Sequence, residues 1–286
     1  MATAGIALFA TMDAVMKQLS IELGAYNAML WRSIIGIGIG ATLFLALRKS
    51  WPARPVLRIH IERGIAGGAS VLLFFWGLKY VPLAQGIALS FIAPLIALYL
   101  AAVLLKERVG KGAVLASLVA FAGVLVILGG QARADLGPEA FRGALAILAA
   151  AVLYAYNLVL MRRQSQVAGP IEVALFLNLV AGGMYALGSP WLAEVPDAAV
   201  FPRLFLASAL AFVSLMLLSW AYARAEAQQL LPVEYTAFIW AALLGWWIFG
   251  EAVSPLTVVG TLMIVAGCII AARKRPNIVS PAEAAL

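Results

Sequence analysis

Residues 76–109 read WGLKYVPLAQGIALSFIAPLIALYLAAVLLKERV, and residues 220–253 read WAYARAEAQQLLPVEYTAFIWAALLGWWIFGEAV. In this register, an offset of 144 residues without a gap, identical residues meet at Trp76 and Trp220, Gln85 and Gln229, Ala93 and Ala237, Glu107 and Glu251, and Gly123 and Gly267. Because apolar residues match by chance in so hydrophobic a sequence, the Trp, Gln and Glu identities carry the argument. They indicate that the chain contains one internal repeat.

The composition predicts that both copies of the repeat lie in a membrane. Of the 286 residues, 64 % are hydrophobic and 12 % charged, and the mean hydropathy is +1.00, whereas soluble domains are about 45–50 % apolar. One span needs roughly 20 apolar residues, and the apolar runs lack the alternation typical of barrel strands. Ten such stretches are expected to be helices: Ala2–Ser20, Tyr26–Leu47, Ile61–Tyr80, Leu83–Leu105, Gly112–Gly130, Phe141–Met161, Ile171–Pro190, Arg203–Tyr222, Gln228–Phe249 and Leu256–Ala272.

The predicted fold is therefore an all-α integral membrane protein with ten transmembrane helices arranged as two inverted five-helix repeats. The first repeat is expected over residues 1–137 and the second over residues 138–286, which end in a short basic cytoplasmic tail. An odd number of spans turns the second copy upside down. Inverted repeats are a transporter architecture, with the substrate site near the midplane at the repeat interface.

Basic residues predict the orientation of the chain in the membrane. Fourteen Lys and Arg residues flank the connections on the side of the termini, against four on the other side, namely Lys79, Arg133, Arg142 and Arg203. Because cytoplasmic loops carry the excess of Lys and Arg, both termini are expected in the cytoplasm, and the chain is expected to be a multi-pass protein of the inner (plasma) membrane. The net charge of +7 is explained by this rule and implies no nucleic-acid partner.

The rare residues argue against an enzyme and against a cofactor or metal. The chain has one Cys, Cys268, and one His, His60, which excludes an internal disulfide and a Cys- or His-rich metal site. No GxxxxGK[ST] or HExxH motif is present. An aspartyl dyad needs two aspartates, but Asp13 is the single Asp within a predicted span. His60, which a Ser–His site would need, is expected in a cytoplasmic connection.

Several motifs resemble the EamA-type family of the drug/metabolite transporter superfamily. The run Val81–Pro94 followed by Leu105–Arg108 is similar to its signature, and Phe249–Glu251 with Gly260 and Gly267 is the counterpart in the second copy. The opening, with Asp13–Lys17 and then Trp31 and Arg32, is also similar. The resemblance implies export of amino acids, other metabolites or drugs, and the length and ten-helix layout favour a YddG-like amino-acid exporter.

Ionisable residues within the spans are functional candidates, since each costs about 2.5–3.5 kcal/mol at the centre of a helix. Asp13, Lys17 and Arg32 are assigned to gating or an ion pair: Asp13 and Arg32 lie at similar depth and are expected to pair, while Lys17 is expected to reach outward toward solvent. A salt bridge that only fixes the first two helices is the alternative. Glu234 has no basic residue at its depth, so it either senses protons, contacts a substrate amine, or is a protonated carboxyl bonded to the backbone.

Two prolines indicate where a cavity would lie. Pro94 and Pro232 interrupt the fourth and ninth spans and free backbone carbonyls, which points to a binding site, although kinks for packing alone are an open alternative. The expected substrate-binding residues are Trp76, Tyr80, Gln85, Ser90, Tyr99, Tyr154, Asn157, Asn178, Gln229, Glu234, Tyr235 and Trp240. An aromatic cavity with few charges favours an amino acid with an apolar side chain, and an interfacial aromatic belt is the other interpretation.

The sequence thus predicts a secondary transporter that exports small metabolites, most of all neutral or aromatic amino acids, by alternating access. Its expected partners are a small-molecule substrate and the lipid bilayer, and the chain is expected to be a monomer or weak dimer. Transport of another metabolite or drug, nucleoside-like or cationic, and a non-transport assembly subunit are the alternatives.

Overall fold

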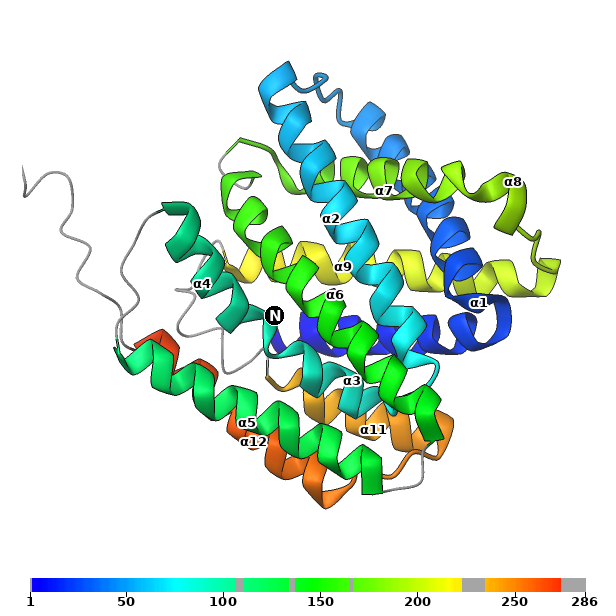
Figure 1. The fold of residues 1–286 in the computed structure, drawn as a ribbon. Coiled ribbons are helices and arrows are strands. Elements are labelled where there is room, and N and C mark those ends of the chain that lie inside the picture. The colour runs from blue at the N-terminus through cyan, green and yellow to red at the C-terminus, as the bar shows by residue number, and fades with distance from the viewer. Residues whose placement is uncertain (1, 106–110, 134–136, 165–166, 223–234, 274–286) are drawn as a thin grey trace, which may run out of the picture.

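The computed structural model describes residues 2–105, 111–133, 137–164, 167–222 and 235–273. These residues form helices and turns, and the described part contains no strand. The elements are α1 (Ala2–Ala46), α2 (Arg54–Leu78), α3 (Leu83–Ser90), α4 (Ala93–Leu105), α5 (Lys111–Arg133), α6 (Gly137–Gln164), α7 (Pro170–Leu187), α8 (Ser189–Leu192), the 3-10 turn η1 (Ala198–Val200), α9 (Phe201–Tyr222), α11 (Ala237–Phe249) and α12 (Pro255–Arg273) (Figure 1).

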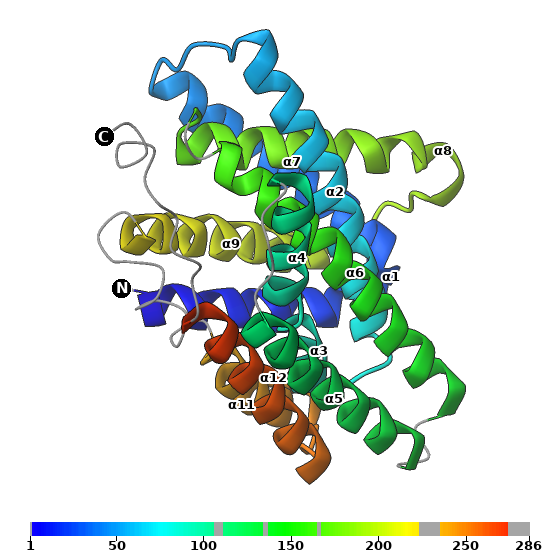
Figure 2. The ribbon, with the colours of Figure 1, turned by 60° about the vertical axis from the view of Figure 1, so that its left-hand side comes forward.

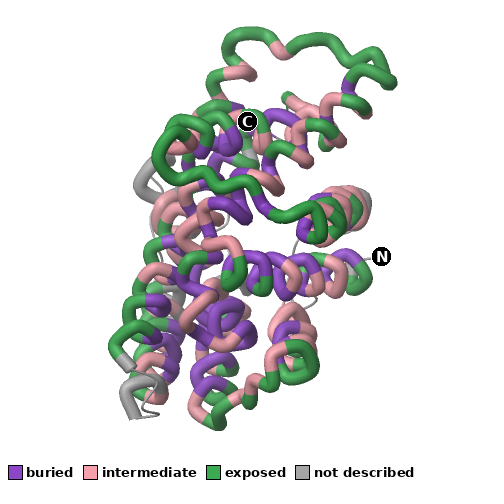
Figure 3. The backbone as a smooth tube through the Cα atoms, turned by 90° about the vertical axis from the view of Figure 1, so that its right-hand side faces the viewer, coloured by how far each residue is buried: buried purple, intermediate pink, exposed green. Residues whose placement is uncertain are grey.

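The predicted all-α membrane fold is confirmed, with each predicted span represented in the described part. Five stretches are long and apolar enough to cross a membrane: Thr3–Ala46, Arg54–Leu78, Pro138–Met161, Pro170–Leu187 and Ala198–Leu218. The remaining apolar helices are shorter. Exposed positions follow the outer sides of the helices and the connections (Figure 3), and large apolar side chains such as Leu118, Phe205 and Leu262 are exposed there, as a lipid-facing surface requires.

The first two spans are joined differently from the prediction. A connection was expected between Ser20 and Tyr26, but α1 continues from Ala2 to Ala46 and bends at a single residue, Gly24. Its φ of 76° and ψ of 148° lie in a region that is essentially restricted to glycine. We call the segments before and after Gly24 the first and second arms of α1.

Other boundaries also differ. The third span begins at Arg54 rather than Ile61, because Pro55 occupies the first turn, where its missing N–H costs nothing. The predicted break in the fourth span is confirmed one turn before Pro94, where α3 ends at Ser90 and α4 begins at Ala93. The carbonyl of Phe91, exposed by this break, accepts a hydrogen bond from Cys268 Sγ at 3.3 Å. Pro232 lies outside the described residues.

The packing of the helices has the symmetry of a doubled fold. Helix α5 packs along α12, the second arm of α1 against α7, and α3 against α11, so each pair joins corresponding spans of the two copies. The contact of α2 with α6 corresponds to that of α9 with α1. Figures 1 and 2 both place α5 and α12 together on one side of the molecule and α7 on the other.

Helices α5 and α12 cross at two glycines. A Cβ atom built on Gly123 would lie 2.6 Å from the carbonyl oxygen of Gly260, and one built on Gly260 would lie equally close to that of Gly123. Small residues allow such close crossings between transmembrane helices.

We therefore expect Gly123→Val to lower the free energy of unfolding by about 1–3 kcal/mol, the usual cost of overpacking. Thermal unfolding in detergent would measure this. Gly129→Val is the matched control on the same helix, because a Cβ there meets nothing within 4 Å. Equal unfolding temperatures for the two variants would contradict the expected clash.

Candidate functional site

Glu251 occupies a position set by the end of α11. Helix α11 ends at Gly250, whose left-handed φ of 65° lets its N–H and that of Glu251 turn back onto the last carbonyls of the helix. The turn directs the carboxylate of Glu251 toward the start of α3. There Glu251 Oε2 accepts a hydrogen bond of 2.7 Å from the backbone N–H of Leu83. Because the first N–H groups of a helix have no partner within it, Glu251 caps α3 from the other repeat.

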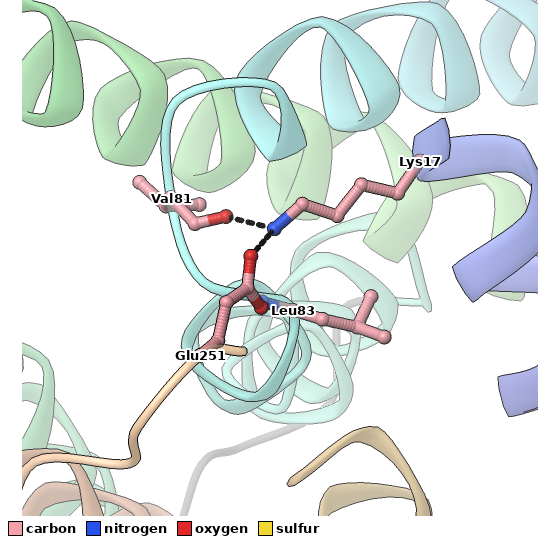
Figure 4. A network of polar contacts seen from close by, with 4 residues as sticks. All are labelled: Lys17, Val81, Leu83 and Glu251. Carbon is pink, nitrogen blue, oxygen red and sulfur yellow. Dashed lines mark hydrogen bonds and ion pairs between the residues drawn. The ribbon is translucent and has the colours of Figure 1, made fainter. Parts of the chain in front are cut away.

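Lys17, on the first arm of α1, completes this contact (Figure 4). Its Nζ donates to the carbonyl oxygen of Val81 at 2.7 Å and forms an ion pair with Glu251 Oε1, and it lies 5.0 Å from the centre of the Phe249 ring. Lys17 is only 2 % exposed, so the prediction that it reaches outward to solvent is wrong. The Lys17 ammonium group therefore contacts two hydrogen-bond acceptors and one aromatic ring, all inside the protein. We call Lys17, Val81, Leu83 and Glu251 the latch.

A second polar cluster joins α2, α6 and α7. Arg63 Nε donates to Asn157 Oδ1 at 3.0 Å, and Arg63 Nη1 donates to Gln164 Oε1. Gln164 Nε2 lies 2.6 Å from His60 Nδ1, and His60 Nε2 lies 2.9 Å from Glu172 Oε1. We call Arg63, Gln164, His60 and Glu172 the relay.

The relay is almost closed to solvent, and its members were largely missed by the sequence analysis. His60 is 1 %, Gln164 2 % and Arg63 6 % exposed. His60 was expected in a connection, but it lies in the second turn of α2, because that helix begins seven residues earlier than its apolar run. The basic residues in the first turns of α2 interrupt its apolar pattern, so the sequence did not indicate a helix there. Of the predicted cavity residues that the structure describes, Asn157, which is buried, bonds to the relay residue Arg63, and Tyr154 interacts with Arg63 electrostatically.

The latch and the relay lie at opposite ends of the helices. Helix α2 begins at Arg54, shortly before the relay residue His60, and ends at Leu78, shortly before the latch residues Val81 and Leu83. Helix α6 ends at the relay residue Gln164. Each end of the bundle is therefore held by its own set of buried polar contacts.

Asp13 and Arg32 lie between these ends, one on each arm of α1. They interact electrostatically, but no ion pair joins them among the salt bridges of the described residues, so the expected pair is not formed. Asp13 is 6 % exposed. The buried Nε of Arg32 has no hydrogen-bond partner in the described structure, as is also true of the hydroxyl of Ser20. The nearby Tyr185 hydroxyl already donates to the carbonyl of Gly68 at 2.7 Å.

The other predicted cavity residues are distributed over several environments. Gln85 is buried at 4 %, Ser90 and Asn178 bond to the carbonyls of Gly86 and Ala174 in their own helices, and Tyr235 packs edge-on against Phe91. Trp76, edge-on to Tyr80, and Tyr154 are exposed at 38 % and 43 %, while Tyr80, Tyr99 and Trp240 are half-buried. Gln229 and Glu234 lie outside the described residues. The structure thus does not bring the predicted set together as one cluster.

An open groove lies elsewhere, between the second arm of α1 and α9. Its lining is apolar apart from Thr42 and comprises Ile35, Gly38, Ile39, Thr42, Leu43 and Phe205. The lining contains no charged residue.

An all-α membrane fold in two inverted units, with buried charges and separate polar contacts at each end, is typical of transporters. The model of the EamA-like transporter family matches residues 1–129 and 141–273. The chain therefore belongs to this family, within the drug/metabolite transporter superfamily, which confirms the resemblance seen in the sequence.

Relatives and a solved structure agree with this assignment. The chain is 25 % identical to a pseudopaline exporter of Pseudomonas aeruginosa over 93 % of both chains. It is 28 % identical to a riboflavin transporter of Vibrio cholerae over 87 % of this chain and 84 % of that one. An S-adenosylmethionine uptake transporter of Rickettsia bellii is 25 % identical over 72 % and 69 %. A crystal structure with 21 % identity matches with a TM-score of 0.60 over 94 % of this chain and 98 % of that one, which shows the fold.

Proposed function

We propose that this transporter exports small zwitterionic metabolites, most of all neutral or aromatic amino acids, from the cytoplasm. The observation that carries the proposal is Arg32, whose Nε has no hydrogen-bond partner among the described residues and whose guanidinium interacts electrostatically with Asp13 on the opposite arm of α1 without forming an ion pair with it. An Arg guanidinium binds a carboxylate through two parallel hydrogen bonds, and a carboxylate accepts from an ammonium group. A molecule carrying both groups would satisfy both residues at once.

The latch and the relay support alternating access. Buried polar contacts at one end of the bundle must separate when that end opens, while those at the other end can remain. We propose the same half-sequence boundary as the sequence predicts, residues 1–137 and 138–286, for the units that move. The latch joins them directly, because Lys17 and Leu83 belong to the first unit and Glu251 to the second.

The test is counterflow into proteoliposomes that contain purified protein. We expect labelled neutral and aromatic amino acids to exchange, with protein-free vesicles as the control. Nucleosides and cationic drugs in the same panel test the alternative substrates. Signal with those compounds alone would contradict the amino-acid proposal and retain a transporter, whereas no signal with any substrate would favour a non-transport subunit.

The orientation in the membrane is proposed from the charge distribution, with both termini in the cytoplasm. In a Cys268→Ala background, we expect Trp191→Cys to react with a membrane-impermeant maleimide in intact cells and Lys49→Cys to react only after lysis. Trp191 is 81 % exposed beyond the end of α7, and Lys49 is exposed in the α1–α2 connection. Labelling in the reverse pattern would invert the proposed topology.

A further inference from the structure

The hydrogen bonds of the relay have a fixed direction. An Arg side chain has only donors, so the amide atom of Gln164 that faces Arg63 must be the oxygen. The other amide atom, Nε2, is then a donor that faces His60 Nδ1 at 2.6 Å. His60 Nδ1 must therefore accept, and the ring proton must lie on Nε2, where it is donated to Glu172 Oε1 at 2.9 Å. The relay runs from Arg63 to Glu172 through one tautomer of a neutral imidazole.

A protonated His60 is incompatible with this arrangement. An imidazolium donates from both ring nitrogens, so its Nδ1–H would face the N–H of Gln164. Rotating the Gln164 amide by half a turn would satisfy His60 but would then place the amide N–H against Arg63. In either case Gln164, the last residue of α6, loses one of its two contacts to α2.

The groups around His60 offer its ring nitrogens no hydrogen-bond partners other than Gln164 and Glu172 among the described residues. Glu172 faces it from α7, Gln164 from α6, and Arg63 lies one turn further along α2. The fourth contact is the Phe176 ring of α7, stacked at 4.6 Å. On α2 itself, Arg58 and Glu62 pair with each other on the exposed side of the helix. No carboxylate from α1 or α6 contacts His60 among the described residues.

We infer that His60 is a proton-binding site, and that binding a proton there breaks one of the two contacts of Gln164 to α2 while it converts the His60–Glu172 hydrogen bond into an ion pair. The imidazolium keeps its Nε2–H toward Glu172 and gains a charge opposite to that of the carboxylate. Proton binding therefore weakens the contact between α2 and α6 at this end. Given the proposed transport function, on which this last step rests, such weakening couples a proton to the movement of a substrate.

The first test observes the proton directly and does not depend on transport. Because the chain contains one His, protein labelled with ¹⁵N-histidine, with any affinity tag removed, gives NMR signals from His60 alone. In lipid nanodiscs at alkaline pH we expect the Nε2–H tautomer, and on acidification the imidazolium. The Nδ1–H tautomer at alkaline pH, or a ring that remains neutral down to the pH at which the protein unfolds, would overturn the inference.

Two variants separate the specific contact from added charge. Gln164→Glu places an acceptor toward both Arg63 and His60 Nδ1, so we expect the imidazolium signal to persist at pH values where the native ring is neutral. Asn157→Asp adds the same charge to α6 but contacts Arg63 rather than His60, and we expect a titration close to that of the native protein. Equal titrations for the two variants would contradict the assigned geometry.

The second test separates this inference from the proposed function. In proteoliposomes with a pH step, we expect the native protein to accumulate substrate in response to the gradient. His60→Asn, a neutral replacement, should lose this response and retain counterflow at equal pH. Counterflow that ignores the pH step in the native protein would refute the coupling of a proton at His60 to transport and would leave the transporter function intact. Absence of all counterflow would instead refute the proposed function.

Discussion

Lys17→Met is expected to destabilise the protein strongly and to abolish its transport. The substitution keeps the length and apolar stem of the side chain but leaves the Glu251 carboxylate without its cation. Breaking a buried ion pair from one side costs about 3–5 kcal/mol. Since the Glu251 side chain is 20 % exposed and Leu83 still donates to it, about 2–3 kcal/mol is the expected loss in free energy of unfolding. Thermal unfolding in detergent and counterflow in vesicles are the measurements.

The matched control for Lys17→Met is the double variant with Glu251→Gln. A neutral amide at position 251 can still accept the hydrogen bond from Leu83, and it no longer carries an uncompensated charge. We expect the double variant to recover a large part of the lost stability. If the double variant is no more stable than Lys17→Met, or if Lys17→Met is as stable as the native protein, the latch is not an energetic contact.

Arg32→Gln is expected to cause the largest loss of transport without a loss of stability. Removing the charged partner of a buried carboxylate costs about 2–5 kcal/mol, so transport of an amino acid should fall by roughly two orders of magnitude. Stability should change little, because among the described residues Arg32 forms no ion pair and its Nε has no hydrogen-bond partner. Initial rates of counterflow, together with thermal unfolding of the same preparations, measure both quantities.

A pair of substrates makes the Arg32 prediction specific. Tryptophan and tryptamine differ by the carboxylate that we assign to Arg32. Arg32→Gln should reduce tryptophan transport and spare any transport of tryptamine, while Asp13→Asn should weaken transport of both, since both carry the ammonium group. Equal loss of tryptophan and tryptamine transport in Arg32→Gln would argue against recognition of the carboxylate by this residue.

The helices were predictable from the sequence because each span consists of a continuous run of apolar residues. Apolar runs located the spans, and Pro94 marked the break between α3 and α4. The helix boundaries were predicted wrongly where the local sequence pattern is ambiguous. Arg54 and Arg58 gave the first turns of α2 the composition of a loop, so His60 was placed outside the helix. The polar residues Ser20 and Glu22 suggested a connection between the first two spans, but they lie in helical turns of α1, which bends at Gly24 alone.

The site was much less predictable, because its contacts join distant parts of the chain. Lys17 and Glu251 are 234 residues apart, and neither position carries a signal for the other. Glu251 was noticed only as part of the repeated motif, with no role attached. Asp13 and Arg32 lie at similar depth by their positions along the two arms, but the sequence gives no information on the direction of their side chains. Depth is set by position along the helix, whereas pairing depends on rotation about it.

The single-residue bend at Gly24 also bears on which molecules the protein accepts. Asp13 lies eleven residues before Gly24 and Arg32 eight after it, distances of roughly 16 and 12 Å along the two arms. Because the shorter arm is about 12 Å long, a rotation of about 10° at the bend would change the separation of the two residues by at most about 2 Å. That is slightly more than the length of one carbon–carbon bond. The angle at Gly24 would then set the distance between Asp13 and Arg32. That distance would select ligands by the spacing between their ammonium and carboxylate groups and would distinguish α-amino acids from longer homologues.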